Sequence, residues 1–293
     1  MADAVARRLR GDGAIVALES TVIAHGLPRP ANLDAARACE RACRETGATP
    51  ATIAIARGEL IVGADDELLR ALAETAGVRK VSTRDIAPTL ALGELGATTV
   101  AASVEVAALA GIRVLATGGI GGVHRGAERT DDVSADLAAI ARYPVVVVCA
   151  GAKVILDIPR TLERLESLGV PVITVGSDEF PAFTVRSSGH RSPYRVEDVA
   201  GAAAIARVRR EQGGGVVVAV PVEERFALDR RDAERAVAAA EAEAARLGIG
   251  GGDVTPFLLR EIADHDARAV HANVELLAAN ARFASELALA MRA

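Results

Sequence analysis

The stretch VVVVCA at 145–150, followed by GAK at 151–153, shows most directly how this chain folds. Consecutive valines that end at a glycine turn are typical of a strand buried on both faces of a sheet. A glycine-rich loop with a histidine, GGIGGVH at 118–124, and an acidic run, TDDVSAD at 130–136, come shortly before it. Such a density of polar groups within about one βαβ unit indicates a functional site. We interpret the rest of the chain as a scaffold that supports this site.

Similar apolar, β-branched runs recur between segments of helical periodicity. Besides 145–150, strands are predicted at 15–21, 51–56, 60–63, 98–103, 114–119, 172–175 and 216–222. Helices are predicted at 31–46, 65–76, 86–95, 103–111, 134–142, 154–168, 196–212, 229–247, 256–265 and 267–291. This alternation favours a three-layer α/β/α fold with a mostly parallel central sheet. The link at 57–60 is too short for a crossover and predicts a hairpin, so the sheet is mixed.

We expect one α/β/α domain over residues 1–293, because the chain shows no internal repeat and no low-complexity linker. The best candidate hinge, QGGG at 212–215, precedes a strand too apolar to lie outside the sheet. TP at 255–256 predicts a helix start with Thr255 as the N-cap and Pro256 in the first turn. The glycines at 250–252, just before it, form a second possible anion site.

The composition excludes several classes of protein. A hydrophobic content of 51% in 293 residues supplies a large core. The net charge of -5 and the 2% aromatic content leave neither a basic face nor a stacking platform for nucleic acid. No leader sequence and no apolar run of about 20 residues is apparent, so we expect no membrane partner and a cytoplasmic location. Cys39, Cys43 and Cys149 are expected to be unpaired thiols.

Lysine is almost absent: of 34 basic residues only Lys80 and Lys153 are lysine. An ε-amine can lose its proton and attack a carbonyl, whereas arginine stays protonated, so these two positions are candidates for amine chemistry. The alternative to a role in amine chemistry is that the two lysines were retained by chance. Lys153 follows the valine strand and precedes a predicted helix, and partial burial near a helix N-terminus favours a neutral, nucleophilic amine.

Glu19 ends an otherwise apolar strand and is a candidate general acid. A carboxyl group there lies either at the sheet edge where α/β sites form or in the core, and desolvation would raise its pKa. A structural carboxylate bonded to backbone amides is the alternative. The irregular loop 20–30 that follows carries His25, a weaker candidate.

Lys80 opens KVSTRD at 80–85, where it could hold a phosphate together with Arg84, or simply pair with Asp85 at the surface. Asp131, Asp132 and Asp136, with His124 nearby, offer hard oxygen ligands for Mg²⁺ or Mn²⁺. Capping of the next helix by Asp132 or Ser134 is the alternative. The glycine loop matches neither the dinucleotide fingerprint nor the P-loop.

Long motifs spread over nearly the whole chain resemble the pseudouridine-5'-phosphate glycosidase family, also called indigoidine synthase A-like. They include LESTVIAHGLPRP at 18–30, KVSTRD at 80–85, ATGGIGGVHRG at 116–126, TDDVSAD at 130–136, CAGAKVILDIPRTLE at 149–163 and ANVELLAANA at 272–281. The resemblance implies reversible cleavage of the C–C glycosidic bond of pseudouridine 5'-phosphate to uracil and ribose 5-phosphate. It also implies a divalent metal, usually Mn²⁺, one per subunit, and a homotrimer of α/β/α subunits.

The same resemblance implies roles for individual residues. Lys153 matches the lysine that forms a Schiff base with C1 of the ring-opened ribose, and Glu19 matches the proton donor. Asp132 matches the metal ligand. Substrate contacts are implied for Lys80, Val100, His124 near the uracil, Ser134, Ala135, Asp136 and Asn273, with Asn273 and less surely Asn280 reaching the phosphate. That late motif departs from the residues usual in the family at Val274, Glu275 and Ala279.

The chemistry explains why such a site would need these residue types. Breaking the C–C bond leaves a carbanion-like uracil carbon, so an iminium at C1 must act as an electron sink while an acid protonates that carbon. We expect Glu19 to be this acid and Asp136 to assist ring opening. A Schiff-base aldolase acting on a phosphosugar and a non-catalytic nucleotide-binding protein are the rival interpretations.

Overall fold

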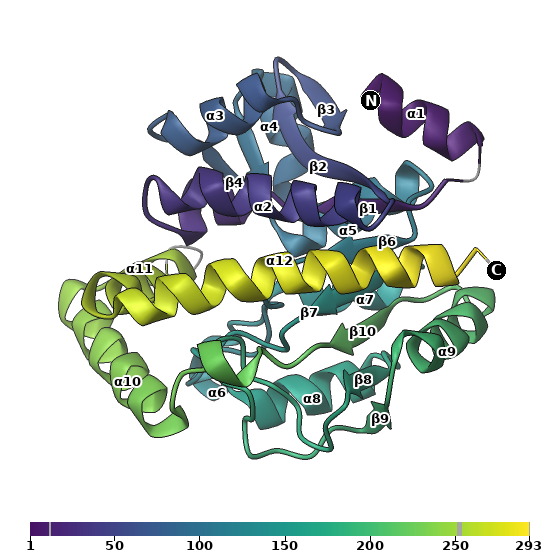
Figure 1. Cartoon of the computed structure of the whole chain (residues 1–293). Coiled ribbons are helices and arrows are strands. Elements are labelled where there is room, and N and C mark those ends of the chain that lie inside the picture. Colours follow the sequence, from purple (N-terminus) through teal and green to yellow (C-terminus); the bar gives the residue numbers. More distant parts are fainter. Residues whose placement is uncertain (12, 251–253, 293) are drawn as a thin grey trace.

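The structure is a computed structural model that describes residues 1–11, 13–250 and 254–292. Within this part of the chain a ten-stranded sheet forms the middle layer (Figure 1). Its order is β4-β5-β2-β1-β6-β7-β10-β8-β9, with β3 also paired to β2. The strands are β1 (Ile15–Leu18), β2 (Thr49–Ala56), β3 (Glu59–Val62), β4 (Arg79–Val81), β5 (Gly96–Thr98), β6 (Val114–Ala116), β7 (Val146–Cys149), β8 (Val172–Val175), β9 (Tyr194–Val196) and β10 (Val216–Ala219).

Helices cover both faces of this sheet. On one face α12 packs against α2 and α9, and on the other α5 packs against α7, which contacts α8 (Figure 1). The helices are α1 (Asp3–Arg10), α2 (Ala31–Glu45), α3 (Asp66–Glu74), α4 (Ile86–Leu92), α5 (Val100–Leu109), α6 (Ala127–Thr130), α7 (Ala135–Arg142), α8 (Ile158–Ser167), α9 (Val199–Glu211), α10 (Arg230–Leu247), α11 (Val254–His265) and α12 (Ala267–Ala290). The predicted three-layer α/β/α fold is therefore confirmed.

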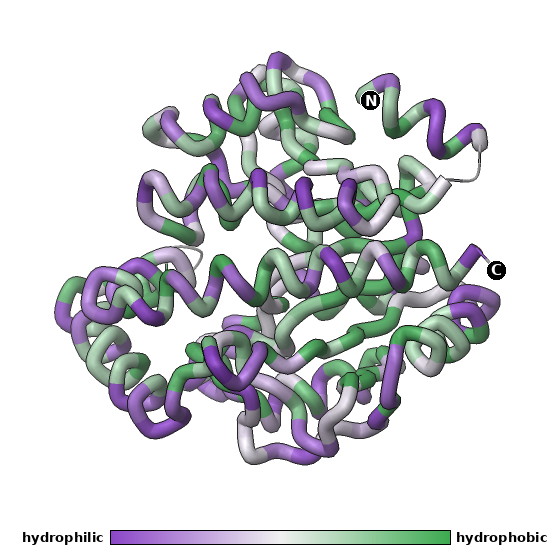
Figure 2. The backbone as a smooth tube through the Cα atoms, viewed as in Figure 1, coloured by the Kyte–Doolittle hydropathy of each residue, from purple (hydrophilic) through white to green (hydrophobic). Residues whose placement is uncertain are grey.

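The valine strand lies in the middle of the sheet, as its composition predicts. β7 pairs in parallel with β6 and β10, and Val148 lies between Ala116 and Val218. Every residue of β7 is buried, and the central strands are the green, hydrophobic part of the tube in Figure 2. None of the described helices has the length and apolar character needed to cross a membrane.

The sheet changes direction at β2, which decides where a site can form. β2 is parallel to β1 over its first half and antiparallel to β3 and β5 over its second half. The carboxyl end of β5 therefore approaches the carboxyl end of β1 from the opposite direction. Hydroxyl groups join the two ends, because Ser20 and Thr98 both donate to the Ile53 carbonyl oxygen, at 2.6 and 2.8 Å.

Several predicted boundaries are wrong for local reasons. The strand predicted at 98–103 ends at Thr98, because the Thr99 hydroxyl accepts a hydrogen bond from Ala102 N and starts α5. The short edge strand β9 and the three-residue β4 were not predicted. Helix α8 begins at Ile158 rather than 154, since Asp157 caps it, so Lys153 is not at a helix N-terminus. In α11 Thr255 lies inside the first turn instead of capping it, and the predicted anion site at 250–252 falls mostly outside the described residues.

A tight turn after β7 carries the lysine. Gly151 has a φ of +82°, in the left-handed region that residues other than glycine rarely adopt. A Cβ atom at this position would also overlap the carbonyl oxygen of Pro181. The turn is tied to the glycine-rich loop, because Ile120 N donates to Gly151 O at 3.0 Å and Lys153 N donates to Ile120 O at 3.1 Å. Glycine at 151 is thus required by both conformation and space.

We expect Gly151→Ala to lower the free energy of unfolding by more than about 2 kcal/mol, since it adds steric overlap to an unfavourable φ. Gly169→Ala is the matched control, because Gly169 also has a positive φ (+67°) but has open space around its Cβ position. Urea denaturation of both variants measures the difference. Equal losses for the two would contradict the close packing on Pro181.

Candidate active site

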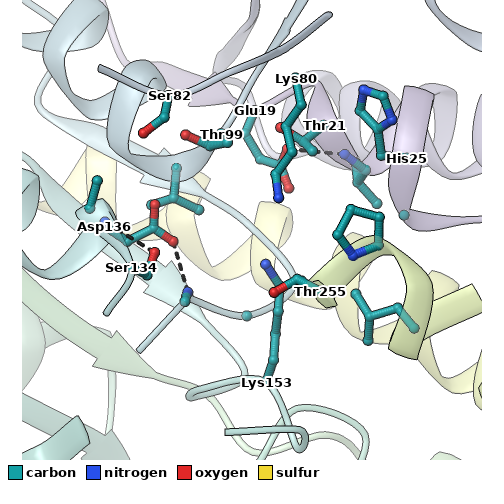
Figure 3. Close-up of a pocket in the computed structure, with 18 of the residues that line it drawn as sticks. Glu19, Thr21, His25, Lys80, Ser82, Thr99, Ser134, Asp136, Lys153 and Thr255 are labelled. Carbon is teal, nitrogen blue, oxygen red and sulfur yellow. Dashed lines mark hydrogen bonds between the residues drawn. The ribbon is translucent and has the colours of Figure 1, made fainter. Parts of the chain in front are cut away.

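One cavity of about 1280 Å³ lies where the carboxyl ends of β1, β6 and β7 meet those of β4 and β5. Ligands of α/β sheets bind at such points of changing strand direction. Thr255 and its neighbours in α11, together with Asn273 in the first part of α12, complete the walls; Figure 3 shows Thr255 at this wall. Of the site residues predicted from the sequence, Asp131 and Asn280 do not line this cavity. Ten others do: Glu19, Lys80, Val100, His124, Asp132, Ser134, Ala135, Asp136, Lys153 and Asn273.

The two lysines enter the cavity from opposite sides (Figure 3). Lys80 comes from β4 and Lys153 from the turn that follows β7, and both side chains are partly buried. Asp85, the surface partner considered for Lys80, accepts a hydrogen bond from Ser82 N at 3.0 Å and forms an ion pair with Arg84 at 3.7 Å. The only two lysines of the chain therefore share a single pocket.

Glu19 lies in this pocket directly after β1. Its Oε2 accepts a hydrogen bond from Val22 N at 3.0 Å and its Oε1 accepts one from Thr117 Oγ1 at 3.3 Å. Val22 begins η1 (Val22–Gly26), a π-helix, which is a rare form often found at functional sites. Burial raises the pKa of the Glu19 carboxyl, and the charge of Lys153 only partly opposes this effect. A carboxyl of this kind, next to an amine, can carry a proton in either direction.

Asp136 joins two walls of the pocket through its buried carboxylate. Its Oδ1 accepts a hydrogen bond from Ala101 N in α5, and its Oδ2 accepts one from Gly121 N in the glycine-rich loop, both at 2.8 Å. A Cβ atom at Gly121 would overlap the Ser134 hydroxyl, so glycine is needed there. Ser134 is the N-cap of α7, as one of the two capping alternatives predicted, and Asp132 is not.

His124 lies at the edge of the pocket between the glycine-rich loop and α11. Its Nε2 is 3.3 Å from the Thr255 hydroxyl. Burial lowers the pKa of His124 and outweighs the nearby Asp132 carboxylate, which raises it. A neutral imidazole can accept or donate a hydrogen bond, so His124 can contact a polar group of a substrate without adding charge.

Asp132 is suited to bind a divalent metal ion that is held by few protein ligands. The residue is partly buried on the pocket wall, and its backbone carbonyl fixes it by accepting a hydrogen bond from His124 N at 3.0 Å. Mg²⁺ and Mn²⁺ are often bound through one or two carboxylates, with waters and substrate phosphate completing the shell. No group of three or more His, Cys, Asp or Glu side chains among the described residues is arranged to bind a metal.

The two asparagines of α12 have different surroundings. Asn273 is buried at the pocket, and its Oδ1 has no hydrogen-bond partner among the described residues. Asn280 donates from Nδ2 to Thr117 O at 2.8 Å and lies behind the pocket wall. Asn280 is therefore a support for the carboxyl end of β6, and the prediction that it reaches the phosphate is not supported by its position.

Several pocket residues were not singled out in the sequence. They are Thr21, Thr99, Thr117 and Phe183. Thr21, Thr99 and Thr117 could have been found, because Thr99 and Thr117 directly follow a strand and Thr21 comes two residues after Glu19. Phe183 reaches the pocket from a distant part of the fold and carries no local signal. Ser82 and Thr255 also line the pocket, although the sequence marked them only as part of the run at 80–85 and as a helix N-cap.

The chain is similar to known proteins over nearly its whole length. The family model described as indigoidine synthase A like protein matches residues 4–290. The chain therefore belongs to the indigoidine synthase A-like family. A pseudouridine-5'-phosphate glycosidase of Myxococcus xanthus (strain DK1622) is 52% identical over 290 residues, covering 98% of this chain and 96% of the relative. One of Paracoccus denitrificans (strain Pd 1222) is 52% identical over 282 residues, covering 94% and 93%. The family predicted from the sequence motifs is confirmed.

Two solved structures share the fold. The prealnumycin C-glycosynthase AlnA in complex with ribulose 5-phosphate matches with a TM-score of 0.90 and 39% identity, covering 99% of this chain and 96% of its own. An indigoidine synthase A-like protein from Thermotoga maritima MSB8 matches with a TM-score of 0.89 and 36% identity, covering 96% and 94%. The architecture is thus common to several members of the family.

The raised pKa of Glu19 predicts a specific pH dependence of stability. A carboxyl with a raised pKa binds its proton more tightly in the folded state, so its ionisation costs stability as the pH rises above the unfolded value of 4.5. We expect Glu19→Gln to unfold at higher urea concentration than the parent protein at pH 7, and this advantage to shrink toward pH 4.5. A stability difference that grows as the pH falls would contradict the assignment.

Proposed function

We propose that this protein is a pseudouridine-5'-phosphate glycosidase that reversibly cleaves the C–C glycosidic bond to give uracil and ribose 5-phosphate. The main support is that Lys153 and Glu19, predicted as nucleophile and acid, lie in one pocket with electrostatic interaction between them. The curated relatives of about 50% identity bear the name of this activity. A structural neighbour whose complex contains ribulose 5-phosphate is consistent with a sugar phosphate as ligand.

The phosphate has a suitable place on the Lys80 side of the pocket. Lys80 supplies a positive charge, and the hydroxyls of Ser82, Thr99 and Ser134 lie around the same part of the pocket (Figure 3). Val100 begins α5, and its backbone amide can add one donor, since the amides of Ala101 and Ala102 already donate to Asp136 and Thr99. Binding the phosphate there would direct the ribose toward Lys153, which enters from the opposite side.

The bond cleavage itself needs an amine and a proton. In ring opening the Lys153 nitrogen bonds to C1 as the bond from C1 to the ring oxygen breaks, and that oxygen takes up the proton that the amine loses. The nitrogen lone pair then forms the C1=N bond as the bond from C1 to the uracil carbon breaks. The electrons of the broken bond remain on that carbon, which takes a proton from Glu19. Water then adds to the iminium and releases ribose 5-phosphate, which restores the free amine. Each step runs in reverse for synthesis.

Other pocket residues orient the substrate in this proposal. His124 contacts the uracil through a neutral ring. The buried Asn273 Oδ1 would accept a hydrogen bond from a hydroxyl or N–H group of the substrate, while the Nδ2 group of the same amide can donate to the phosphate. The carboxylate of Asp136 could assist ring opening only with the lone pairs that Ala101 N and Gly121 N leave available.

Asp132, together with waters, would bind the divalent metal ion, for which Mn²⁺ is the expected species. Such an ion would supply positive charge that orients the substrate and stabilises developing negative charge. The homotrimer implied by the family resemblance and the cytoplasmic location expected from the sequence remain predictions.

We expect uracil release when the protein is incubated with pseudouridine 5'-phosphate and Mn²⁺, and at least a tenfold loss of rate after chelation, restored by added Mn²⁺. Chromatography of uracil measures both. Asp132→Asn should weaken the response to Mn²⁺ because it removes the charge of the ligand. Cleavage of phosphosugars without uracil release would instead favour the aldolase interpretation.

We expect borohydride to trap ribose 5-phosphate covalently on Lys153, because reduction converts the iminium to a stable amine. Peptide mass spectrometry locates the adduct. Lys153→Arg should abolish it, whereas Lys80→Arg, the matched control that changes the other lysine, should retain it at a higher ligand concentration. An adduct on Lys80, or none, would rule out the proposed nucleophile.

A further inference from the structure

The segment between β8 and β9 returns to the turn that carries Lys153. Ala182 forms an antiparallel bridge with Gly151, and Phe183 N donates to Ala150 O at 2.8 Å. Phe180, which is fully buried, anchors the segment in the core. Residues far from the lysine in sequence are thereby bonded to the backbone two and three positions before it.

Phe183 occupies this segment in an unusual backbone conformation. Ala182 and Val185 exchange two hydrogen bonds, of 3.0 and 3.1 Å, that close a tight turn around it. Its φ of +62° lies in the left-handed region, which is rare for a bulky side chain. Such strain persists only where surrounding contacts determine the conformation, and it is concentrated at functional sites.

The ring of Phe183 lies against the glycines that the lysine stem also approaches. A Cβ atom at Gly119 would be 2.9 Å from Phe183 Cδ2 and 3.5 Å from Lys153 Cγ. A Cβ atom at Gly118 would be 3.0 Å from Phe183 Cε2. The ring is only 5% exposed but forms part of the pocket wall. It therefore fills the space that the glycine-rich loop leaves open beside the lysine.

We propose that Phe183 is a positioning residue for Lys153. Its ring packs against the glycine-rich loop and holds that loop against the aliphatic part of the Lys153 side chain. Its backbone amide fixes the end of β7. The Lys153 amine is thereby held where it can reach C1 of the substrate. Nothing in its own chemistry reacts with the substrate. This inference rests on the proposed function, because it assumes that Lys153 forms the Schiff base.

The test compares Phe183→Ala and the milder Phe183→Leu with the parent protein. Misplacing a reacting group by about 1 Å can cost on the order of 100-fold in rate. We expect Phe183→Ala to lower kcat and the rate of borohydride trapping with ribose 5-phosphate by about 10- to 100-fold, while KM changes by less than about threefold. Phe183→Leu should fold and show a smaller loss of the same kind.

Phe180→Leu is the matched control, since Phe180 belongs to the same segment and is buried but does not line the pocket. It should lower the melting temperature and leave the trapping rate per folded molecule unchanged. Equal trapping rates for the parent and both Phe183 variants would overturn the inference, as would an equal slowing in Phe180→Leu. No adduct in the parent protein would instead refute the proposed function.

Discussion

The reversal of direction at β2 is the constraint on which the rest of the structure depends. A purely parallel sheet would present all its carboxyl ends along one edge, whereas here two groups of strands end facing each other. Buried hydroxyls of Ser20 and Thr98 fix this junction by sharing the carbonyl oxygen of Ile53. Polar residues that follow opposing strands can therefore surround a ligand, which explains how Lys80 and Lys153 approach one volume from opposite walls.

Within that volume, burial disfavours the charged forms of two ionisable side chains. Glu19 is held by the Val22 amide and the Thr117 hydroxyl, yet burial still favours its protonated form. His124 is kept neutral by burial in the same way. Asp136 is buried too, but two backbone amides satisfy its carboxylate. Asp136 thereby joins α5 to the glycine-rich loop, whereas burial disfavours the charged forms of Glu19 and His124.

The sequence predicted the layers and most of the pocket, because both depend on local patterns. The valine run specifies β7, and the polar residues after β1, β6 and β7 mark the site. The boundary errors arise where a side chain caps a helix early or late, as at Thr99 and Asp157. The contribution of Phe183 could not be predicted, because it depends on a long-range contact between the segment after β8 and the turn after β7.

The rarity of lysine in this chain has a practical consequence. Because Lys80 and Lys153 are the only lysines and both line the pocket, the outer surface carries its positive charge as arginine. Reagents that couple to primary amines, used routinely to attach dyes or to immobilise proteins, will find only the N-terminus and the interior of the pocket. Labelling of this kind would report pocket accessibility, and any tether intended to spare the pocket needs a different attachment chemistry.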